Sequence, residues 1–291
     1  MLGHVLTAIV TPFREDGSVD FAAFQALAVH LVENGSDRIV VAGTTGESPT
    51  LSDAEREDLV RAALEAVGDT AAVVAGTGTY STEHSVRLTE AAHDLGASAF
   101  LVVAPYYNKP PQRGIVAHFA EIARATDRPI MAYNIPSRVV VNIEPETISR
   151  LAEIENVSAV KQAHDDLDHA RHIVACGLDL YAGDDNLVQP FLELGGVGGV
   201  CVHTHVVGPQ VAEQVRAALG GDIDHAREID RALEPSYELL GVAPNPIAIK
   251  AALRLLGHQV GGHRLPLVDA SDHEVARVRV CLERLGLLVP A

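Results

Sequence analysis

One lysine of the chain is placed where it could act as a nucleophile. Lys161 directly follows residues 157–160, an apolar run with the composition of a β-strand. Burial disfavours the charged form of an amine, so a lysine at this position can offer the neutral amine that attacks a carbonyl carbon and forms an imine. A strand-end lysine can instead extend its charged head into solvent, so Lys161 alone leaves both interpretations open.

Hydroxyl groups near other predicted strand ends could support imine chemistry. Tyr133 ends one apolar run, and Thr44 and Thr45 follow another. Forming an imine requires proton transfers to and from a carbinolamine, which a phenol and an aliphatic hydroxyl can relay. The alternative for Tyr133 is a core aromatic residue whose hydroxyl has an ordinary partner.

Two features are suited to binding a carboxylate. Residues 43–48 read Gly-Thr-Thr-Gly-Glu-Ser, and the glycines leave the amides of Thr44 and Thr45 exposed, although such a segment can be a simple turn. Arg138 follows a proline in a predicted loop and can hold a carboxylate through two parallel hydrogen bonds. A surface salt bridge is the alternative for Arg138.

The elements that must position these residues follow a regular alternation. Short apolar runs recur along the chain, each followed by a stretch with helical spacing. Eight such runs are predicted strands, at residues 5–10, 38–42, 71–75, 99–104, 129–134, 157–161, 178–182 and 198–202. This pattern predicts an α/β fold, a (β/α)8 TIM barrel with a C-terminal helical extension. The active site of such a barrel lies at the C-terminal ends of the strands, where Lys161, Tyr133, Thr44 and Arg138 converge.

The chain divides into a catalytic barrel and a helical tail. Residues 52–55 (Ser-Asp-Ala-Glu) form a predicted capping box at the start of a helix. Gly220 and Gly221 interrupt the helix that follows the eighth strand, and two further helical stretches come after them. We expect a barrel at residues 1–224 and a C-terminal helical domain at 225–291.

Composition excludes several classes of partner. The chain has 291 residues, 47% of them hydrophobic, and a formal net charge of −17 from 22 Lys and Arg against 39 Asp and Glu. Such a charge repels nucleic acid and anionic membranes. Three widely spaced cysteines give no disulfide framework and no thiolate zinc site, and no signal peptide is recognisable. We therefore expect a cytoplasmic protein without nucleic-acid or membrane partners.

Taken together, four motifs resemble those of a known family. The segments G-T-T-G-E-S, P-Y-Y-N and Y-N-I-P-S-R and the strand-end lysine occur here in the order and spacing of the dihydrodipicolinate synthase/N-acetylneuraminate lyase family of class I aldolase barrels. The resemblance covers nearly the whole chain and extends to Asn245-Pro246 and residues 265–267.

The resemblance implies roles for the residues that match the family motifs. Lys161 would form the Schiff base, and Tyr133, Thr44 and Tyr107 would form a proton relay, with Tyr107 supplied by a neighbouring subunit. The implied assembly is a homotetramer, a dimer of such dimers. Substrate-binding residues would be Thr45, whose amide with that of Thr44 holds the pyruvate carboxylate, together with Arg138, Gly183 and Val200.

Arg138 separates the subfamilies, because the synthases have arginine at this position and the sialic acid lyases do not. The resemblance therefore implies a lyase that condenses pyruvate with L-aspartate 4-semialdehyde to 4-hydroxy-tetrahydrodipicolinate, a step of lysine and diaminopimelate biosynthesis, without a cofactor. The alternatives are a Schiff-base aldolase or dehydratase acting on a sugar-derived 2-oxo acid, and a catalytically silent barrel that binds ligands or serves as a scaffold.

Some residues depart from the family pattern. Gln162 follows the lysine where many members have an acid. Lysine-inhibited members have two histidines and an acid in an interface pocket where this chain has Asp53, Arg56 and His84, which argues against lysine feedback.

Metal and phosphate sites are competing interpretations for three other segments. His203 and His205, expected on one face of strand eight, could join Asp184 and Asp185 in a metal site. We expect a hydrogen-bonded histidine pair and no metal. Residues 164–169 are interpreted as the acidic start of a helix, and the glycine run 195–199 as a tight turn at the structural face of the barrel.

Overall fold

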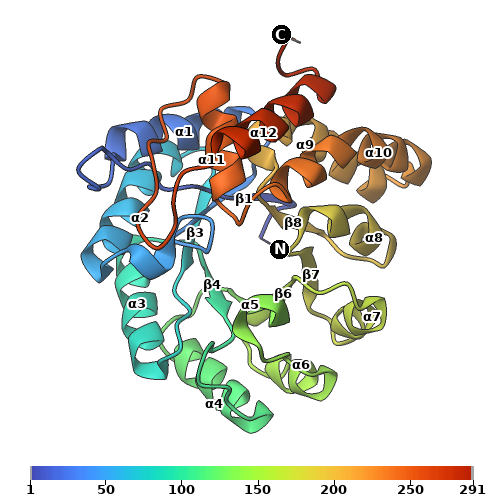
Figure 1. The fold of residues 1–291 in the computed structure, drawn as a ribbon. Helices are drawn as coiled ribbons and strands as arrows, with labels where there is room; N and C mark the ends of the chain where they lie inside the picture. Colours follow the sequence, from blue (N-terminus) through green and yellow to red (C-terminus); the bar gives the residue numbers. More distant parts are fainter. Residues whose placement is uncertain (1, 290–291) are drawn as a thin grey trace.

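The computed structural model describes residues 2–289 and contains a closed barrel of eight parallel strands (Figure 1). Each strand pairs with the next in sequence, and β8 closes the barrel onto β1. The strands are β1 (Val5–Ala8), β2 (Arg38–Val41), β3 (Ala72–Gly76), β4 (Ala99–Val103), β5 (Ile130–Asn134), β6 (Val157–Gln162), β7 (Asp179–Ala182) and β8 (Gly198–Cys201). The predicted fold class is confirmed, and each predicted strand overlaps an observed one.

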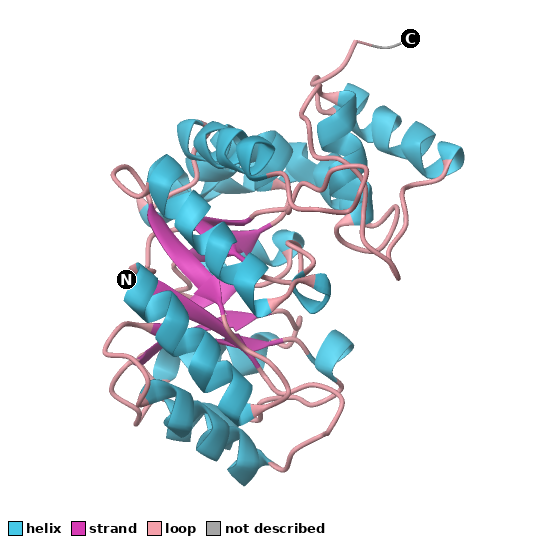
Figure 2. Ribbon diagram, turned by 90° about the vertical axis from the view of Figure 1, so that its left-hand side faces the viewer, coloured by secondary structure: helices cyan, strands magenta, loops and turns pink. Residues whose placement is uncertain are grey.

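Helices surround the barrel on its outer side (Figures 1 and 2). The helices that follow the first seven strands are α1 (Phe21–Glu33), η1 (Ser48–Thr50), α2 (Asp53–Val67), α3 (Thr82–Leu95), α4 (Gln112–Ala123), α5 (Pro136–Val139), α6 (Pro145–Leu151), α7 (Leu167–Ala175), η2 (Asp185–Leu187) and α8 (Val188–Glu193). After β8 come α9 (Thr204–Leu219), α10 (Ile223–Leu240), α11 (Ile247–Leu255) and α12 (Asp272–Arg284). Among the helices within residues 2–289, none combines the length and the apolar character needed to cross a bilayer.

Two predicted helix starts are confirmed at the level of individual hydrogen bonds. Ser52 caps α2, and Glu55 returns a bond to the Ser52 amide, which completes the capping box. Asp166 caps α7 by accepting from the amides of Asp168 and His169, so residues 164–169 begin a helix as expected. Side-chain oxygens thus satisfy amide groups that have no partner inside either helix.

The glycine run before β8 is a turn at the opposite end of the barrel from the C-terminal strand ends. Gly198 begins β8 with a φ of 155°, and a Cβ on it would lie 1.8 Å from the carbonyl oxygen of His4. Only glycine allows the chain to pass this close to β1. The predicted structural role of the run is confirmed.

The predicted placement of His203 and His205 on strand eight was wrong, although both rings are hydrogen-bonded as expected. β8 ends at Cys201, so neither His203 nor His205 lies on a strand, and His205 belongs to α9. His205 is fully occupied: its Nε2 accepts from the amide of Val10 at 3.2 Å, and its Nδ1 donates to the carbonyl of Val202 at 2.8 Å. α9 begins at Thr204 and has a kink at Val207, two residues before Pro209.

The last three helices pack beside the barrel, with α10 against α9, α8 and η2 and α11 against α9 (Figure 1). α9 ends at Leu219, and α10 begins at Ile223 after a two-glycine turn. The boundary at 224/225 remains a prediction, since the helices form one continuous hydrophobic cluster with the barrel.

Candidate active site

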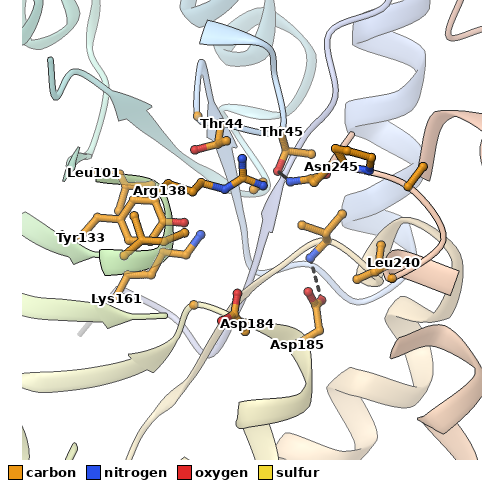
Figure 3. A pocket seen from close by; sticks show the side chains of 18 of the residues that line it. Thr44, Thr45, Leu101, Tyr133, Arg138, Lys161, Asp184, Asp185, Leu240 and Asn245 are labelled. Atoms are coloured by element: carbon orange, nitrogen blue, oxygen red, sulfur yellow. Dashed lines mark hydrogen bonds between the residues drawn. The ribbon is translucent and has the colours of Figure 1, made fainter. Parts of the chain in front are cut away.

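A cavity of about 490 Å³ opens at the C-terminal ends of the strands. It is lined by side chains from several strand ends and by the segment between α10 and α11 (Figure 3). Its polar lining residues are Thr44, Thr45, Tyr133, Arg138, Lys161, Asp184, Asp185 and Asn245. The barrel therefore brings most of the predicted site residues to one place.

Lys161 lies near the end of β6, where it is 5% exposed. The register of β5 and β6 pairs it with Tyr133, so both side chains point the same way from adjacent strands. The Lys161 Nζ lies 4.2 Å from the centre of the Tyr133 ring. Within residues 2–289, no carboxylate forms an ion pair or hydrogen bond with this amine. Lys161 is thus a buried amine that faces a cavity and has a phenol as its neighbour.

The loop after β2 presents backbone donors to the same cavity. Its turn is closed by hydrogen bonds from Gly46 to the carbonyl of Gly43 and from Glu47 to that of Thr44, both at 3.1 Å. The amides of Thr44 and Thr45 take no part in this bonding and remain available for an anion. The Thr45 hydroxyl accepts from the side-chain amide of Asn245 at 2.9 Å, which fixes the side chain.

Arg138 and Asp184 lie across the cavity opening from one another (Figure 3). Arg138 comes from the short helix α5 and donates to no carboxylate within the described chain, so its guanidinium is free for a ligand. Desolvation raises the pKa of Asp184, and the charges of Lys161 and Arg138 counteract the rise. The cavity therefore places two basic side chains, Lys161 and Arg138, and two acids, Asp184 and Asp185, around a space large enough for a small ligand.

The other three predicted site residues differ in their position relative to the cavity. Gly183 lines the cavity, and a Cβ there would come within 2.7 Å of the Ala163 side chain. Val200 is buried in β8 and does not line the cavity, whereas Val202 does. Tyr107 is 90% exposed, has a left-handed φ of 71°, and lies outside the cavity of its own chain.

Asn245 is a site residue that the motifs did not single out. It sits in the tail, 200 positions after its partner Thr45, and it precedes a cis peptide bond to Pro246. The only signal in the sequence was the Asn-Pro pair within the family resemblance, which carries no information on where the side chain points.

Gln162 follows Lys161 at a position where many family members have an acid. Its side chain belongs to a buried amide network. Its Oε1 accepts from Asn134 Nδ2 at 2.9 Å, and the same Asn134 group donates to Asn142. Asn134 Oδ1 accepts from the Ile143 amide. A neutral amide at position 162 thus links β6 to the segment after β5, and the side chain next to Lys161 points away from the cavity.

A second buried lysine fastens the tail to the loop that carries Thr44 and Thr45. Lys250 of α11 donates to Glu47 Oε1 and to the carbonyl of Gly262, both at 2.7 Å. The other Glu47 oxygen accepts from the Arg264 amide at 3.2 Å. Burial lowers the pKa of Lys250, and the adjacent Glu47 carboxylate opposes this effect. Both side chains of the pair are completely buried.

The residues at the family's lysine-inhibitor positions lie in the first turns of α2 and α3. His84 Nε2 is 2.8 Å from Asp53 Oδ1, and Arg56 donates to the carbonyl of Ser48 at 2.6 Å. Burial lowers the pKa of Arg56 and raises that of Tyr106. The absence of lysine feedback remains a prediction.

Comparison with known proteins gives a consistent result. A model of the dihydrodipicolinate synthetase family matches residues 1–285. A 4-hydroxy-tetrahydrodipicolinate synthase of Heliobacterium modesticaldum is 47% identical over 288 residues, with 98% of this chain and 96% of that protein covered. The synthase of Acidothermus cellulolyticus is 49% identical over 285 residues, covering 98% and 92%.

Solved structures agree with the sequence relatives. A crystal structure of DHDPS from Cyanidioschyzon merolae with lysine bound has a TM-score of 0.96 at 44% identity, covering 99% of each chain. The dihydrodipicolinate synthase of Thermotoga maritima has a TM-score of 0.95 at 40% identity, covering 99% of this chain and all of that one.

Proposed function

Because this chain belongs to the dihydrodipicolinate synthetase family, we propose that its cavity condenses pyruvate with L-aspartate 4-semialdehyde through a Schiff base on Lys161. The product is 4-hydroxy-tetrahydrodipicolinate, and the enzyme is a lyase of lysine and diaminopimelate biosynthesis. The observation that carries the assignment is the Lys161 amine, buried beside Tyr133 and without an acidic partner in the described part of the chain.

The first half of the reaction activates pyruvate. The Lys161 nitrogen attacks the ketone carbon, and loss of water from the carbinolamine gives the imine. Tyr133 transfers protons in this step, relayed by Thr44 and by Tyr107 of a second subunit. The free amides of Thr44 and Thr45 hold the pyruvate carboxylate. Loss of a methyl proton then converts the imine to an enamine.

The second half forms the carbon–carbon bond. The enamine carbon attacks the aldehyde carbon of the semialdehyde, and the resulting alkoxide takes up a proton. The amino group of the former semialdehyde then attacks the imine carbon, closes the ring and expels the Lys161 amine. Arg138 binds the semialdehyde carboxylate through its unpaired guanidinium. Gly183, which lines the cavity, contributes backbone to the substrate site.

The exposed position of Tyr107 supports a shared active site. Tyr107 is 90% exposed and has a left-handed backbone conformation. Both features are explained if a second copy of the chain covers this side chain. We assign the assembly as a homotetramer built from two such dimers, located in the cytoplasm. Mixing Lys161→Ala subunits with Tyr107→Phe subunits tests this, because a mixed dimer contains one site with both native groups. Activity should return on mixing, and no return would contradict a shared site.

Reduction with borohydride tests the central proposal. The chain has three lysines, Lys109, Lys161 and Lys250, so peptide mass spectrometry assigns a trapped pyruvate adduct without ambiguity. We expect one adduct, on Lys161, and none in Lys161→Arg. Lys109→Arg is the matched control and should be labelled like the native chain. An adduct on Lys109, or none at all, would refute the assignment.

The rival reaction on a sugar-derived 2-oxo acid uses the same imine. The named relatives do not favour it. A coupled assay with each aldehyde, at equal pyruvate, distinguishes the two reactions.

A further inference from the structure

Three residues with metal-binding side chains meet in the protein interior behind the catalytic cavity. They are Asp185 of η2, Cys201 at the end of β8, and His203 immediately before α9. Their ligand atoms all lie within 4.8 Å of one another, and all three residues are buried. The proposed condensation uses neither Cys201 nor His203.

Hydrogen bonding determines which nitrogen of His203 carries the proton. The Ser236 hydroxyl donates to the carbonyl of Leu233 at 2.7 Å. A hydroxyl has a single proton, so the contact of 3.0 Å between Ser236 Oγ and His203 Nδ1 requires the ring nitrogen to donate. Nδ1 is therefore protonated, and the neutral ring has a lone pair on Nε2.

That lone pair is a buried acceptor beside a carboxylate. His203 Nε2 is buried without a hydrogen-bond partner in residues 2–289, and it lies 3.4 Å from Asp185 Oδ1. That oxygen already accepts from the amides of Val202 and His203 and has no proton to give to Nε2. An acceptor nitrogen next to a carboxylate in a dry interior is satisfied by a cation, which is either a proton on Nε2 or a metal ion.

The spacing favours a metal ion over a proton. A charged N–H···O⁻ bond normally draws the two atoms to about 2.7–2.9 Å. Ligand atoms held tetrahedrally at about 2.0–2.1 Å from a zinc ion are separated by about 3.3–3.4 Å. The observed 3.4 Å matches the second arrangement.

We propose that Asp185, Cys201 and His203 bind one divalent ion of the zinc class. A thiolate, an imidazole and a carboxylate form a donor set suited to zinc, and the two anionic ligands balance its charge. Ser236 orients the imidazole through its other nitrogen, as a neighbouring acceptor does at many metal sites. Amides of Val202 and His203 fix the Asp185 carboxylate at 2.7 and 2.8 Å.

The position suggests how the ion enters and what it does. Asp185 lines the catalytic cavity, which offers a path from solvent (Figure 3). The ligands come from η2, β8 and the start of α9, and Ser236 belongs to α10. A bound ion therefore ties the mouth of the barrel to the first tail helix and stabilises the fold, while the imine chemistry takes place on Lys161.

Metal reconstitution of the full chain tests the proposal. After removal of metals with EDTA and dialysis, the protein is titrated with Zn²⁺ or Co²⁺. We expect about one equivalent to be retained, a thiolate-to-cobalt charge-transfer band, and a higher melting temperature with zinc. Cys201→Ser should lose the band, and His203→Gln should lose the retained ion.

A matched control uses the other two cysteines. Cys176 also lies beside an imidazole, 3.4 Å from His172 Nε2, so it is the competing thiol site. The Cys176→Ser/Cys281→Ser double variant leaves Cys201 as the sole thiol and must keep the cobalt band, even if Cys201→Ser fails to fold. Loss of the band in this double variant would overturn the proposal. So would a chain that retains no ion and whose His203 ring shows protons on both nitrogens by NMR.

Discussion

Lys161 and Lys250 are both buried, at 5% and 0% exposure, yet their amines have opposite surroundings. Lys250 lies in the seam between barrel and tail, bound to Glu47 and to a backbone carbonyl. Lys161 lies at the cavity with an aromatic ring beside it, and no carboxylate among residues 2–289 is bound to it. A buried lysine with an ion partner stabilises a connection, whereas one without a partner is available for chemistry.

Exchanging the nucleophile gives the largest expected effect. Lys161→Arg keeps a cation but removes the imine-forming amine, so kcat/KM should fall by at least about 10³-fold, or about 4 kcal/mol. Urea unfolding should show little loss of stability, because Lys161 has no ion partner to leave behind. A stability loss as large as that of a Lys250 variant would erase the distinction between the two lysines.

Breaking the ion pair between Lys250 and Glu47 should have the opposite effect, a large loss of stability. Lys250→Met leaves the Glu47 carboxylate buried and uncompensated, which should reduce the free energy of unfolding by about 3–5 kcal/mol. Adding Glu47→Gln removes the stranded charge and should restore part of that loss. The measurement is a double-mutant cycle by urea denaturation. Additive losses would show that the pair is not coupled.

Acid should destabilise the fold through His205, whose ring joins α9 to the segment after β1. Burial lowers the pKa of His205 from 6.5 to about 4. As pH falls through this window the unfolded chain binds a proton and the folded chain does not, so the free energy of unfolding decreases by about 3 kcal/mol in all. His205→Gln should show a shallower decline between pH 6.5 and 4. Equal slopes for both proteins would assign the acid sensitivity to other groups.

Replacing Arg138 should impair the reaction of aspartate semialdehyde and leave that of pyruvate unchanged. Arg138→Ala should lower kcat/KM for aspartate semialdehyde by about 10²-fold, near 2.7 kcal/mol, through the lost carboxylate contact. Trapping of the pyruvate adduct on Lys161 should be unchanged. Intact turnover of the semialdehyde would remove the basis for the substrate assignment.

Removing the hydrogen bond between Asn245 of the tail and Thr45 at the cavity should have the smallest effect on activity. Asn245→Ala removes the 2.9 Å hydrogen bond to Thr45, a contact worth about 1 kcal/mol. We expect kcat/KM for pyruvate to fall about fivefold because the Thr45 loop loses its support. Asn186→Ala, on the exposed surface, is the control and should leave the kinetics unchanged.

The sequence by itself determined the barrel, the strand positions, the cap at Ser52 and the strand-end location of Lys161. These features depend on residues close together in the chain, whose apolar periodicity and capping chemistry act locally. The same local reasoning failed at His203 and His205, because nothing nearby in the sequence indicates that β8 stops at Cys201.

Only the tertiary structure decided which distant groups meet. Glu47 and Lys250 are 203 positions apart, and Thr45 and Asn245 are 200 apart, so no local pattern encodes either contact. The proton position on His203 depends on Ser236, from a helix of the tail. Hydrogen bonds and ion pairs of this kind form only once the core has brought the elements together, because their geometry tolerates errors of a few tenths of an ångström and sequence patterns do not specify position that finely.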